Sequence, residues 1–296
     1  GMKFGLWFEP EMISPDSDLY REHPDWAIHI DEREGVQSRN QMVLDLSRDE
    51  VCEYVINAVS DILANANIEY VKWDMNRQLT DMPRLGYNHE YTLGYYKIMS
   101  AITEKFPNIL FEGCSAGGGR FDAGVLAYMP QIWTSDNSDA IARLKMQYST
   151  SMCYPVYSIS SHVTASPNHQ CGRVTSLKTR ADVAYCGTFG YELDVTKMSD
   201  EEFKEIKAQI KFEKRIQDLM CNGDLYRLIN PYETNYCSWE VISKDKKHIF
   251  VMACKVLAVA QTKSEKVKLQ GLDVNKRYRN MLTGKVYSSD FLMYHG

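Results

Sequence analysis

The alternation of strand-like and helical segments over residues 1–222 constrains the fold of this chain more than any other feature of its sequence. Apolar runs of strand length end in a polar residue, and stretches with apolar residues at helical spacing follow most of them. The predicted strands cover residues 3–9, 68–74, 109–114, 131–136, 154–163 and 183–193, and the predicted helices cover residues 48–66, 88–106, 121–129, 138–149 and 199–221. A strand–helix alternation repeated about six times predicts an α/β fold with a parallel sheet and right-handed crossovers.

The polar residues at the strand ends favour a barrel over an open, doubly wound sheet, although the alternation by itself allows both. Catalytic residues collect at the carboxyl ends of the strands in barrels. The predicted strands here end in such residues, namely Glu9, Asp74, Glu112 to Cys114, Asp136 and His162. We therefore predict a (β/α)8-type barrel as the framework of residues 1–222.

The pattern changes after Asn222 and Gly223. The helical period stops, and short alternating runs follow at about 236–243, 248–256, 266–270 and 276–280, separated by turn residues. This pattern predicts a small antiparallel β domain over residues 223–296, so that the chain has two domains, 1–222 and 223–296. Among helix ends, Asn88 is a candidate cap, and Ser199 with Glu202 has the spacing of a capping box.

Composition excludes several classes of partner. The 34 Lys and Arg against 39 Asp and Glu give a net charge of -5, which argues against nucleic acid. The longest apolar run, 249–260, is interrupted by Lys255 and is well short of the ~20 residues that span a membrane. Eight scattered cysteines without a Cys-x-x-Cys pair, and a chain start without a signal peptide, predict reduced thiols and a cytoplasmic location.

No metal or nucleotide motif stands out. The sequence has no His-Glu-x-x-His, no zinc-ligand spacing, and no Gly-x-Gly-x-x-Gly after the first strand. A nicotinamide- or phosphate-binding α/β domain is the alternative that alternation alone allows. The missing glycine fingerprint argues against it.

Residues 70–77 form the segment with the clearest chemical potential. Side chains alternate faces along a strand, so Lys72 and Asp74 share one face, while Val71 and Trp73 share the other. Burying a lysine and a carboxylate is costly unless they are paired or functional. A lysine beside a carboxylate keeps it ionised, which suits a nucleophile. A structural salt bridge at a strand end is the alternative.

A second pair of carboxylates, Asp136 and Asp139, follows the predicted strand 131–136. Either could cap the next helix, and Asp139 is the better candidate because it lies nearer the helical run. Two carboxylates from different strands, with aromatic rings beside them, are what glycoside hydrolysis requires. Trp7 and Trp133 offer flat apolar surfaces for a sugar ring, whereas Trp73 is predicted to pack in the core.

The third segment, 114–120, is rich in glycine. Glycines allow the backbone to approach a ligand closely. The Gly-Lys-Ser/Thr of a phosphate-binding P-loop is missing, because Arg120 and Phe121 follow the glycines.

Taken together, these segments resemble glycoside hydrolase family 36, the α-galactosidases. The resemblance covers essentially the whole chain and rests on GLWFEPEMISPDSDLY (5–20), SRNQMVLDLSR (38–48), VKWDMNR (71–77), LFEGCSAGGGRFD (110–122) and PQIWTSDNSDAIARLKMQY (130–148). It implies retaining hydrolysis of terminal α-galactosides such as melibiose and raffinose, with no cofactor and no metal.

The resemblance also implies roles for particular residues. Asp74 matches the family's nucleophile and Asp136 its acid/base. The sugar-contacting positions of the family match Trp7, Arg39, Lys72, Cys114 and Trp133. Ala116 stands where the family loop CSGGGGR has its first glycine, so we expect its methyl group to crowd a sugar if the backbone approaches one there.

Family members carry a β-sandwich domain and two further barrel strands before the segment that matches the start of this sequence. We therefore expect an incomplete barrel of about six βα units. Its open sheet edges would need cover from self-association into a homo-oligomer or from a partner chain. Two alternatives to an active hydrolase follow: a truncated, catalytically silent fragment, and a galactosyl-transferring relative similar to raffinose synthase.

Overall fold

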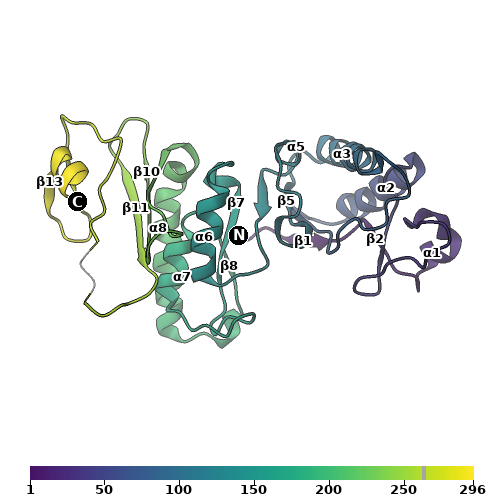
Figure 1. The fold of residues 1–296 in the computed structure, drawn as a ribbon, viewed down its shortest axis with the longest axis horizontal. Helices are drawn as coiled ribbons and strands as arrows, with labels where there is room; N and C mark the ends of the chain where they lie inside the picture. The colour runs from purple at the N-terminus through teal and green to yellow at the C-terminus, as the bar shows by residue number, and fades with distance from the viewer. Residues whose placement is uncertain (262–264) are drawn as a thin grey trace. The chain divides into compact units, whose positions relative to one another are not determined.

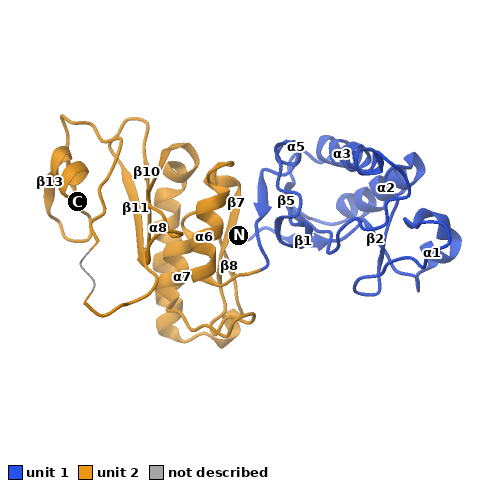
Figure 2. Cartoon of the chain, in the orientation of Figure 1, with its two compact units in different colours: residues 1–136 blue, residues 137–296 orange. Residues whose placement is uncertain are grey.

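The computed structural model describes residues 1–261 and 265–296, and these form two compact units (Figure 2). The first unit covers residues 1–136 and the second covers residues 137–296. Each has a hydrophobic core of its own. The predicted domain boundary between residues 222 and 223 rests on the sequence pattern and stays a prediction.

The first unit is built on parallel strands in the order β1 (Gly5–Phe8), β4 (Tyr70–Trp73), β5 (Leu110–Gly113) and β6 (Gln131–Trp133). Their register aligns Trp7 with Lys72, Lys72 with Glu112, and Glu112 with Gln131. One face of the sheet is therefore polar. The other face carries Val71, Trp73 and Phe111, which are buried in the core.

Helices cover the apolar face of this sheet. Helices α2 (Asp49–Asn65) and α3 (Tyr87–Lys105) pack against each other (Figure 1). The ring of Trp73 meets that of Tyr95 in α3 at a centroid distance of 6.4 Å, which confirms Trp73 as a core residue. The expected cap Asn88 is wrong: α3 begins at Tyr87, and its N-cap is Gly86, whose φ of 83° suits glycine.

Short elements complete the first unit, and the sequence analysis predicted only one of them. Strand β2 (Met12–Ile13) pairs antiparallel with β3 (Met42–Val43). Helix α1 (Asp18–Glu22) lies between them in the chain. Helices α4 (Ser115–Gly118) and α5 (Ala123–Leu126) follow β5. Only α5 was expected, because it alone carries a helical apolar pattern.

The second unit begins with α6 (Ala140–Thr150), β7 (Ile159–Thr164), α7 (Leu177–Ala184), β8 (Thr188–Glu192) and α8 (Asp200–Asn222). Strands β7 and β8 are parallel. Asp139 caps α6, and Ser199 with Glu202 forms the capping box of α8, as predicted. Helix α7 was missed, and both strands are shorter than predicted because a 3-10 turn (Val156–Ser158) and α7 occupy their first residues.

Antiparallel sheets follow, as the sequence predicts. Strands β9 (Asp224–Ile229), β10 (Tyr236–Ile242) and β11 (Ile249–Lys255) pair in the order β11-β10-β9. Strands β12 (Arg277–Arg279) and β13 (Val286–Ser288) form a hairpin before a π-helical turn (Phe291–His295). The predicted strand at 266–270 is wrong, since the Gln270 amide donates to the Glu240 side chain and the segment is irregular.

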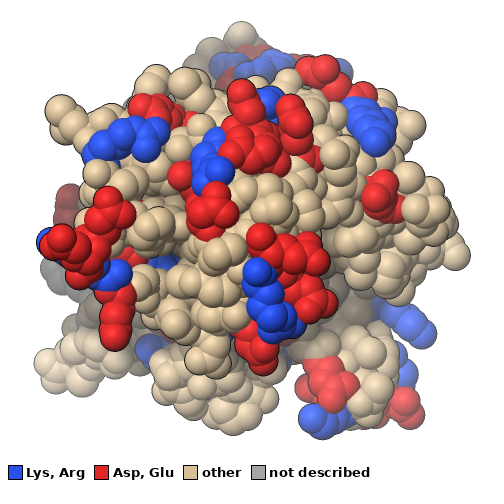
Figure 3. Space-filling model, turned by 90° about the vertical axis from the view of Figure 1, so that its right-hand side faces the viewer, with Lys and Arg blue, Asp and Glu red and all other residues tan. Residues whose placement is uncertain are grey.

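Charges of both signs are intermixed on the face of the molecule that Figure 3 shows. Arg21 pairs with Asp16, and Arg48 pairs with Asp25 and Glu50. Such exposed pairs contribute little stability, because water and salt screen the attraction. Across residues 1–261 and 265–296, none of the helices combines the length and apolar character needed to cross a membrane.

The carboxyl group of Glu240 in β10 is fully buried. One oxygen accepts the Gln270 amide at 2.9 Å, and in the part of the chain described here Oε2 has no hydrogen-bond partner. Burial raises the pKa of Glu240 from 4.5 to about 7. The folded state therefore binds this proton more tightly than the unfolded chain does, and stability falls as pH rises from about 4.5 to about 7.

We predict that Glu240→Gln removes this loss of folding stability at high pH. At pH 8 the variant should unfold with a free energy about 1–3 kcal/mol larger than that of the wild type, and the difference should disappear near pH 4. Urea unfolding at a series of pH values measures it, with the exposed Glu233→Gln as control. Parallel pH dependences in wild type and Glu240→Gln would contradict the assignment.

Candidate active site

Asp74 lies at the centre of the polar side chains that the strand ends of the first unit bring together. It follows β4 directly and is 5% exposed. Its Oδ2 accepts hydrogen bonds from Trp7 Nε1 at 3.1 Å and from Asn76 Nδ2 at 2.8 Å. Its Oδ1 accepts the backbone amides of Met75 at 2.8 Å and Ala116 at 3.3 Å. Strand β1, the loop after β4 and the glycine-rich loop therefore converge on one carboxylate.

These hydrogen bonds determine the ionisation of Asp74. Burial opposes the charge, but hydrogen bonds from Asn76, Trp7, Cys114 and Ala116 outweigh it and hold the pKa of Asp74 below its usual value. The sequence argument had assigned this effect to Lys72. In the structure Lys72 Nζ instead pairs with Glu112 Oε1 at 3.5 Å, so neutral donors keep Asp74 ionised.

Asp136 lies in a different environment. The Nε1 of Trp133 donates to its Oδ1 at 3.1 Å, and its side chain is exposed. The face of Trp133 is covered by Lys72 Nζ, 5.0 Å from the ring centroid. One carboxylate is thus buried among donors, and the other is open to solvent. Such a difference in environment is how two carboxylates acquire different catalytic roles.

The glycine-rich loop contacts both acidic segments. Ser115, Ala116, Gly117 and Gly118 have φ values of 59°, 51°, 77° and 91°, a run in the left-handed region. The Ala116 amide faces Asp74, and a Cβ added to Gly117 would lie 2.6 Å from the Asp136 backbone nitrogen. Non-glycine residues in this region cost about 1–2 kcal/mol each, so the loop needs support from its surroundings.

A buried ion pair supplies that support. Arg120, directly after the loop, donates to both oxygens of Glu11 at 2.8 and 2.7 Å. Glu11 is fully buried and also accepts Trp73 Nε1 at 2.8 Å and the Tyr91 hydroxyl at 2.7 Å. Burial opposes the charge of Arg120, but the Glu11 carboxylate raises the pKa of Arg120 above its usual range.

Glu9 and Asn76 also contribute in a way the sequence analysis missed. Glu9 Oε1 accepts the backbone amide and the side-chain Nδ2 of Asn76, both at 2.8 Å. These bonds direct the amide nitrogen of Asn76 toward Asp74. Glu9 was noted only as a strand-end residue, and no sequence pattern links it to a side chain 67 positions away.

The predicted site residues fall into two groups. Trp7, Asp74, Cys114 and Ala116 share hydrogen bonds, and Lys72, Trp133 and Asp136 form a neighbouring chain of contacts. Burial raises the pKa of Cys114 to about 12, so its thiol stays protonated and able to donate. Arg39 is separate: it is exposed in a tight turn, and its side chain makes no hydrogen bond with the residues that the structure describes.

This arrangement is typical of a glycoside hydrolase: two carboxylates beyond the ends of parallel strands, each hydrogen-bonded to a tryptophan. In 1–261 and 265–296, no group of three or more His, Cys, Asp or Glu side chains is placed to hold a metal ion.

Comparison with known proteins identifies the family. The melibiase family model matches residues 1–223, and the C-terminal domain of glycosyl hydrolase family 36 matches residues 236–296. The chain therefore belongs to the melibiase family of glycoside hydrolase family 36.

Among curated relatives, α-galactosidase AgaA of Geobacillus stearothermophilus is 50% identical over 304 residues, covering 100% of this chain and 42% of the relative. Mel36A of Lactobacillus acidophilus is 48% identical, with 41% of its length covered. The chain thus spans about two fifths of the length of these relatives.

Solved structures confirm the fold. A crystal structure of an AgaA variant with raffinose has a TM-score of 0.97 at 49% identity, covering 100% of this chain and 42% of that one. Another variant with stachyose has a TM-score of 0.96 at 50% identity and the same coverage. The six parallel strands are therefore those of an incomplete (β/α)8 barrel, followed by small antiparallel sheets, as predicted.

We predict that Gly117→Ala shifts the backbone amide resonance of Asp136, because an added Cβ would lie 2.6 Å from the Asp136 backbone nitrogen and displace it. Gly86→Ala is the matched control: its φ is also positive, at 83°, but an added Cβ meets nothing within 4 Å. Both variants should lose about 1–2 kcal/mol of stability. An Asp136 amide resonance that shifts equally in the two variants would refute the steric explanation.

We also predict that Asn76→Ala raises the pKa of Asp74, because it removes a 2.8 Å hydrogen bond to the charged form. Carbon-13 NMR titration of the Asp74 carboxyl carbon measures this change directly, with the exposed Asn88→Ala as control. An unaltered Asp74 titration in Asn76→Ala would show that other groups determine its ionisation.

Proposed function

We propose that this chain carries the catalytic carboxylates of an enzyme that releases terminal α-linked galactose with retention of configuration. The observation that supports this most strongly is the buried Asp74 carboxylate, which four hydrogen-bond donors keep ionised. Asp136, by contrast, is exposed and accepts a hydrogen bond from Trp133. Asp74 is the proposed nucleophile, and Asp136 is the proposed acid/base.

The reaction has two displacements. In the first, an Asp74 oxygen bonds to the anomeric carbon while the bond to the leaving oxygen breaks, and Asp136 gives that oxygen a proton. In the second, Asp136 takes a proton from water, the water oxygen bonds to the anomeric carbon, and Asp74 leaves as a carboxylate. A nucleophile with a low pKa and an exposed proton donor match these two roles.

The proposed substrates are terminal α-galactosides such as melibiose and raffinose. Support comes from the AgaA variants, which were crystallised with raffinose and stachyose. The residues proposed to contact the sugar are Trp7, Arg39, Lys72, Cys114, Ala116 and Trp133. Trp7 suits this role because the residue is 52% exposed although its indole nitrogen donates a hydrogen bond to Asp74.

Because the chain spans about 42% of AgaA, the activity of this chain is itself part of the proposal, and the assay below tests it directly. We propose two domains, residues 1–222 and 223–296, in a cytoplasmic protein. Cover for the sheet edges comes from self-association or a partner chain. A catalytically silent fragment and a galactosyl-transferring enzyme remain the competing proposals.

Hydrolysis of p-nitrophenyl α-galactoside tests the function. Asp74→Asn and Asp136→Asn should each lower kcat/KM by about 1,000-fold or more, while the exposed Asp61→Asn should leave it unchanged. NMR of the first product should show α-galactose, and an initial β-anomer would refute the assigned roles. Galactose binding without turnover would identify the silent fragment, and galactosylated sucrose as the main product would identify the transferase.

A further inference from the structure

Arg39 occupies an unfavourable turn. Ser38 and Gln41 exchange two backbone hydrogen bonds, of 2.9 and 3.0 Å, and enclose a two-residue hairpin turn. Arg39 and Asn40 at its tip have φ values of 53° and 59°. A turn with two left-handed residues prefers Asn-Gly, so an arginine in its first position is unfavourable. Surrounding groups must therefore maintain this conformation.

The loop after β4 holds the segment that leads into this hairpin. Val36 is bound through both of its backbone groups. Its N–H donates to Asp81 Oδ2 at 3.1 Å, and its carbonyl oxygen accepts a hydrogen bond from Arg77 Nη1. Two backbone bonds to one residue fix both its position and its orientation.

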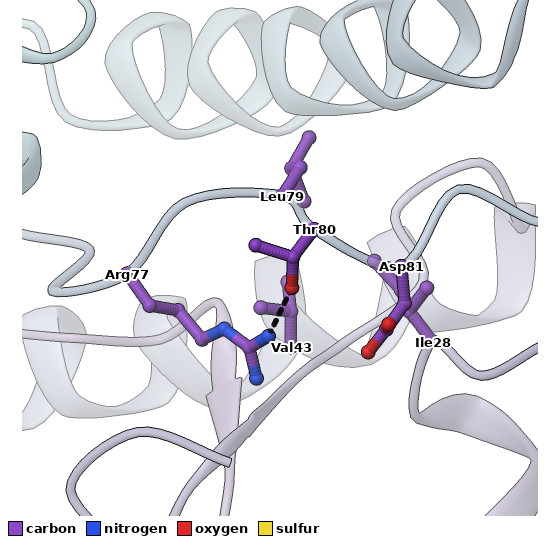
Figure 4. A pocket seen from close by; sticks show the side chains of 6 residues that line it. All are labelled: Ile28, Val43, Arg77, Leu79, Thr80 and Asp81. Carbon is purple, nitrogen blue, oxygen red and sulfur yellow. Dashed lines mark hydrogen bonds between the residues drawn. The ribbon is translucent and has the colours of Figure 1, made fainter. Parts of the chain in front are cut away.

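The Arg77 side chain is itself held in place. Its Nη2 donates to Thr80 Oγ1 at 2.9 Å, and its Nε donates to the Gln78 carbonyl at 3.3 Å. Figure 4 shows Arg77, Thr80 and Asp81 on one loop beside a small pocket that is also lined by Val43 and Ile28. Val43 and Ile28 are buried and joined by a 2.8 Å backbone bond, so the base of the hairpin segment is also anchored.

We propose that Arg77 and Asp81 are positioning residues that hold the Arg39 hairpin in the orientation that binds the sugar. Arg77 follows Asp74 in the same loop, so the segment that carries the proposed nucleophile also fixes the hairpin. The guanidinium of Arg77 is engaged by Val36, Thr80 and Gln78, so it acts through the hairpin and not on the sugar. The inference rests on the proposed function, in which Arg39 contacts galactose.

A double-mutant cycle on the full chain tests the coupling. Arg77→Ala and Asp81→Ala should each weaken galactose binding about tenfold by calorimetry, because the hairpin loses its orientation. In an Arg39→Ala background, Arg77→Ala should cause no further loss. Asp81→Asn, which keeps an oxygen acceptor for the Val36 amide, should restore most of the affinity. Arg84→Ala, in the same loop but paired with Glu90, is the matched control and should bind normally.

Hydrogen exchange of the Val36 amide gives a second readout that does not depend on sugar binding. Exchange should accelerate at least about tenfold in Asp81→Ala and stay unchanged in Arg84→Ala. Unchanged exchange in Asp81→Ala, or equal losses of affinity from Arg77→Ala with and without Arg39, would overturn the positioning role. A wild-type chain that binds no galactose would instead reject the proposed function. The exchange rates would still decide whether Asp81 holds the Val36 amide.

Discussion

The buried Glu11 carboxylate is the interaction on which the site depends. Its two oxygens accept hydrogen bonds from Arg120, Trp73 and Tyr91. The Glu11 carboxylate therefore joins the end of the glycine-rich loop to β4 and α3. Breaking a buried ion pair by removing one partner typically costs about 3–5 kcal/mol, because the remaining charge is uncompensated. The pair therefore opposes local rearrangement of the segments that surround Asp74, because any shift of Arg120 would leave the fully buried Glu11 carboxylate without its counter-charge.

This rigidity has a chemical consequence. The donors that keep Asp74 ionised belong to β1, to the loop after β4 and to the left-handed run at 115–118, each of which is anchored independently of any sugar. Donors fixed before the reaction stabilise charge without reorganising, which is the most effective form of electrostatic support. Asp136 accepts the Trp133 indole N–H and is exposed, which suits a group that must exchange protons with water.

Sequence patterns predicted what depends on local signals. Amphipathic spacing located α2 and α3, the Ser199–Glu202 capping box located the start of α8, and alternation along β4 placed Lys72 and Asp74 on one face. Helix α7 was missed, and the irregular 266–270 segment was assigned wrongly because a tertiary contact, the Gln270–Glu240 hydrogen bond, overrides a weak local preference there. The Glu11–Arg120 pair spans 109 positions, and no local period encodes it. The family resemblance marked Arg39 as a candidate, but no sequence pattern showed the hairpin turn between Ser38 and Gln41 that holds it, or the bonds of Val36 that precede this turn.

The central claim is that Asp74 attacks the anomeric carbon. A fluorinated galactosyl fluoride, whose covalent intermediate breaks down slowly, tests it most directly, with peptide mapping by mass spectrometry after digestion. If Asp74 is the nucleophile, one fluorogalactosyl group is expected on the peptide that contains Asp74, and none on the Asp74→Asn variant. Labelling of Asp136 or another carboxylate, with Asp74 unmodified, would contradict it.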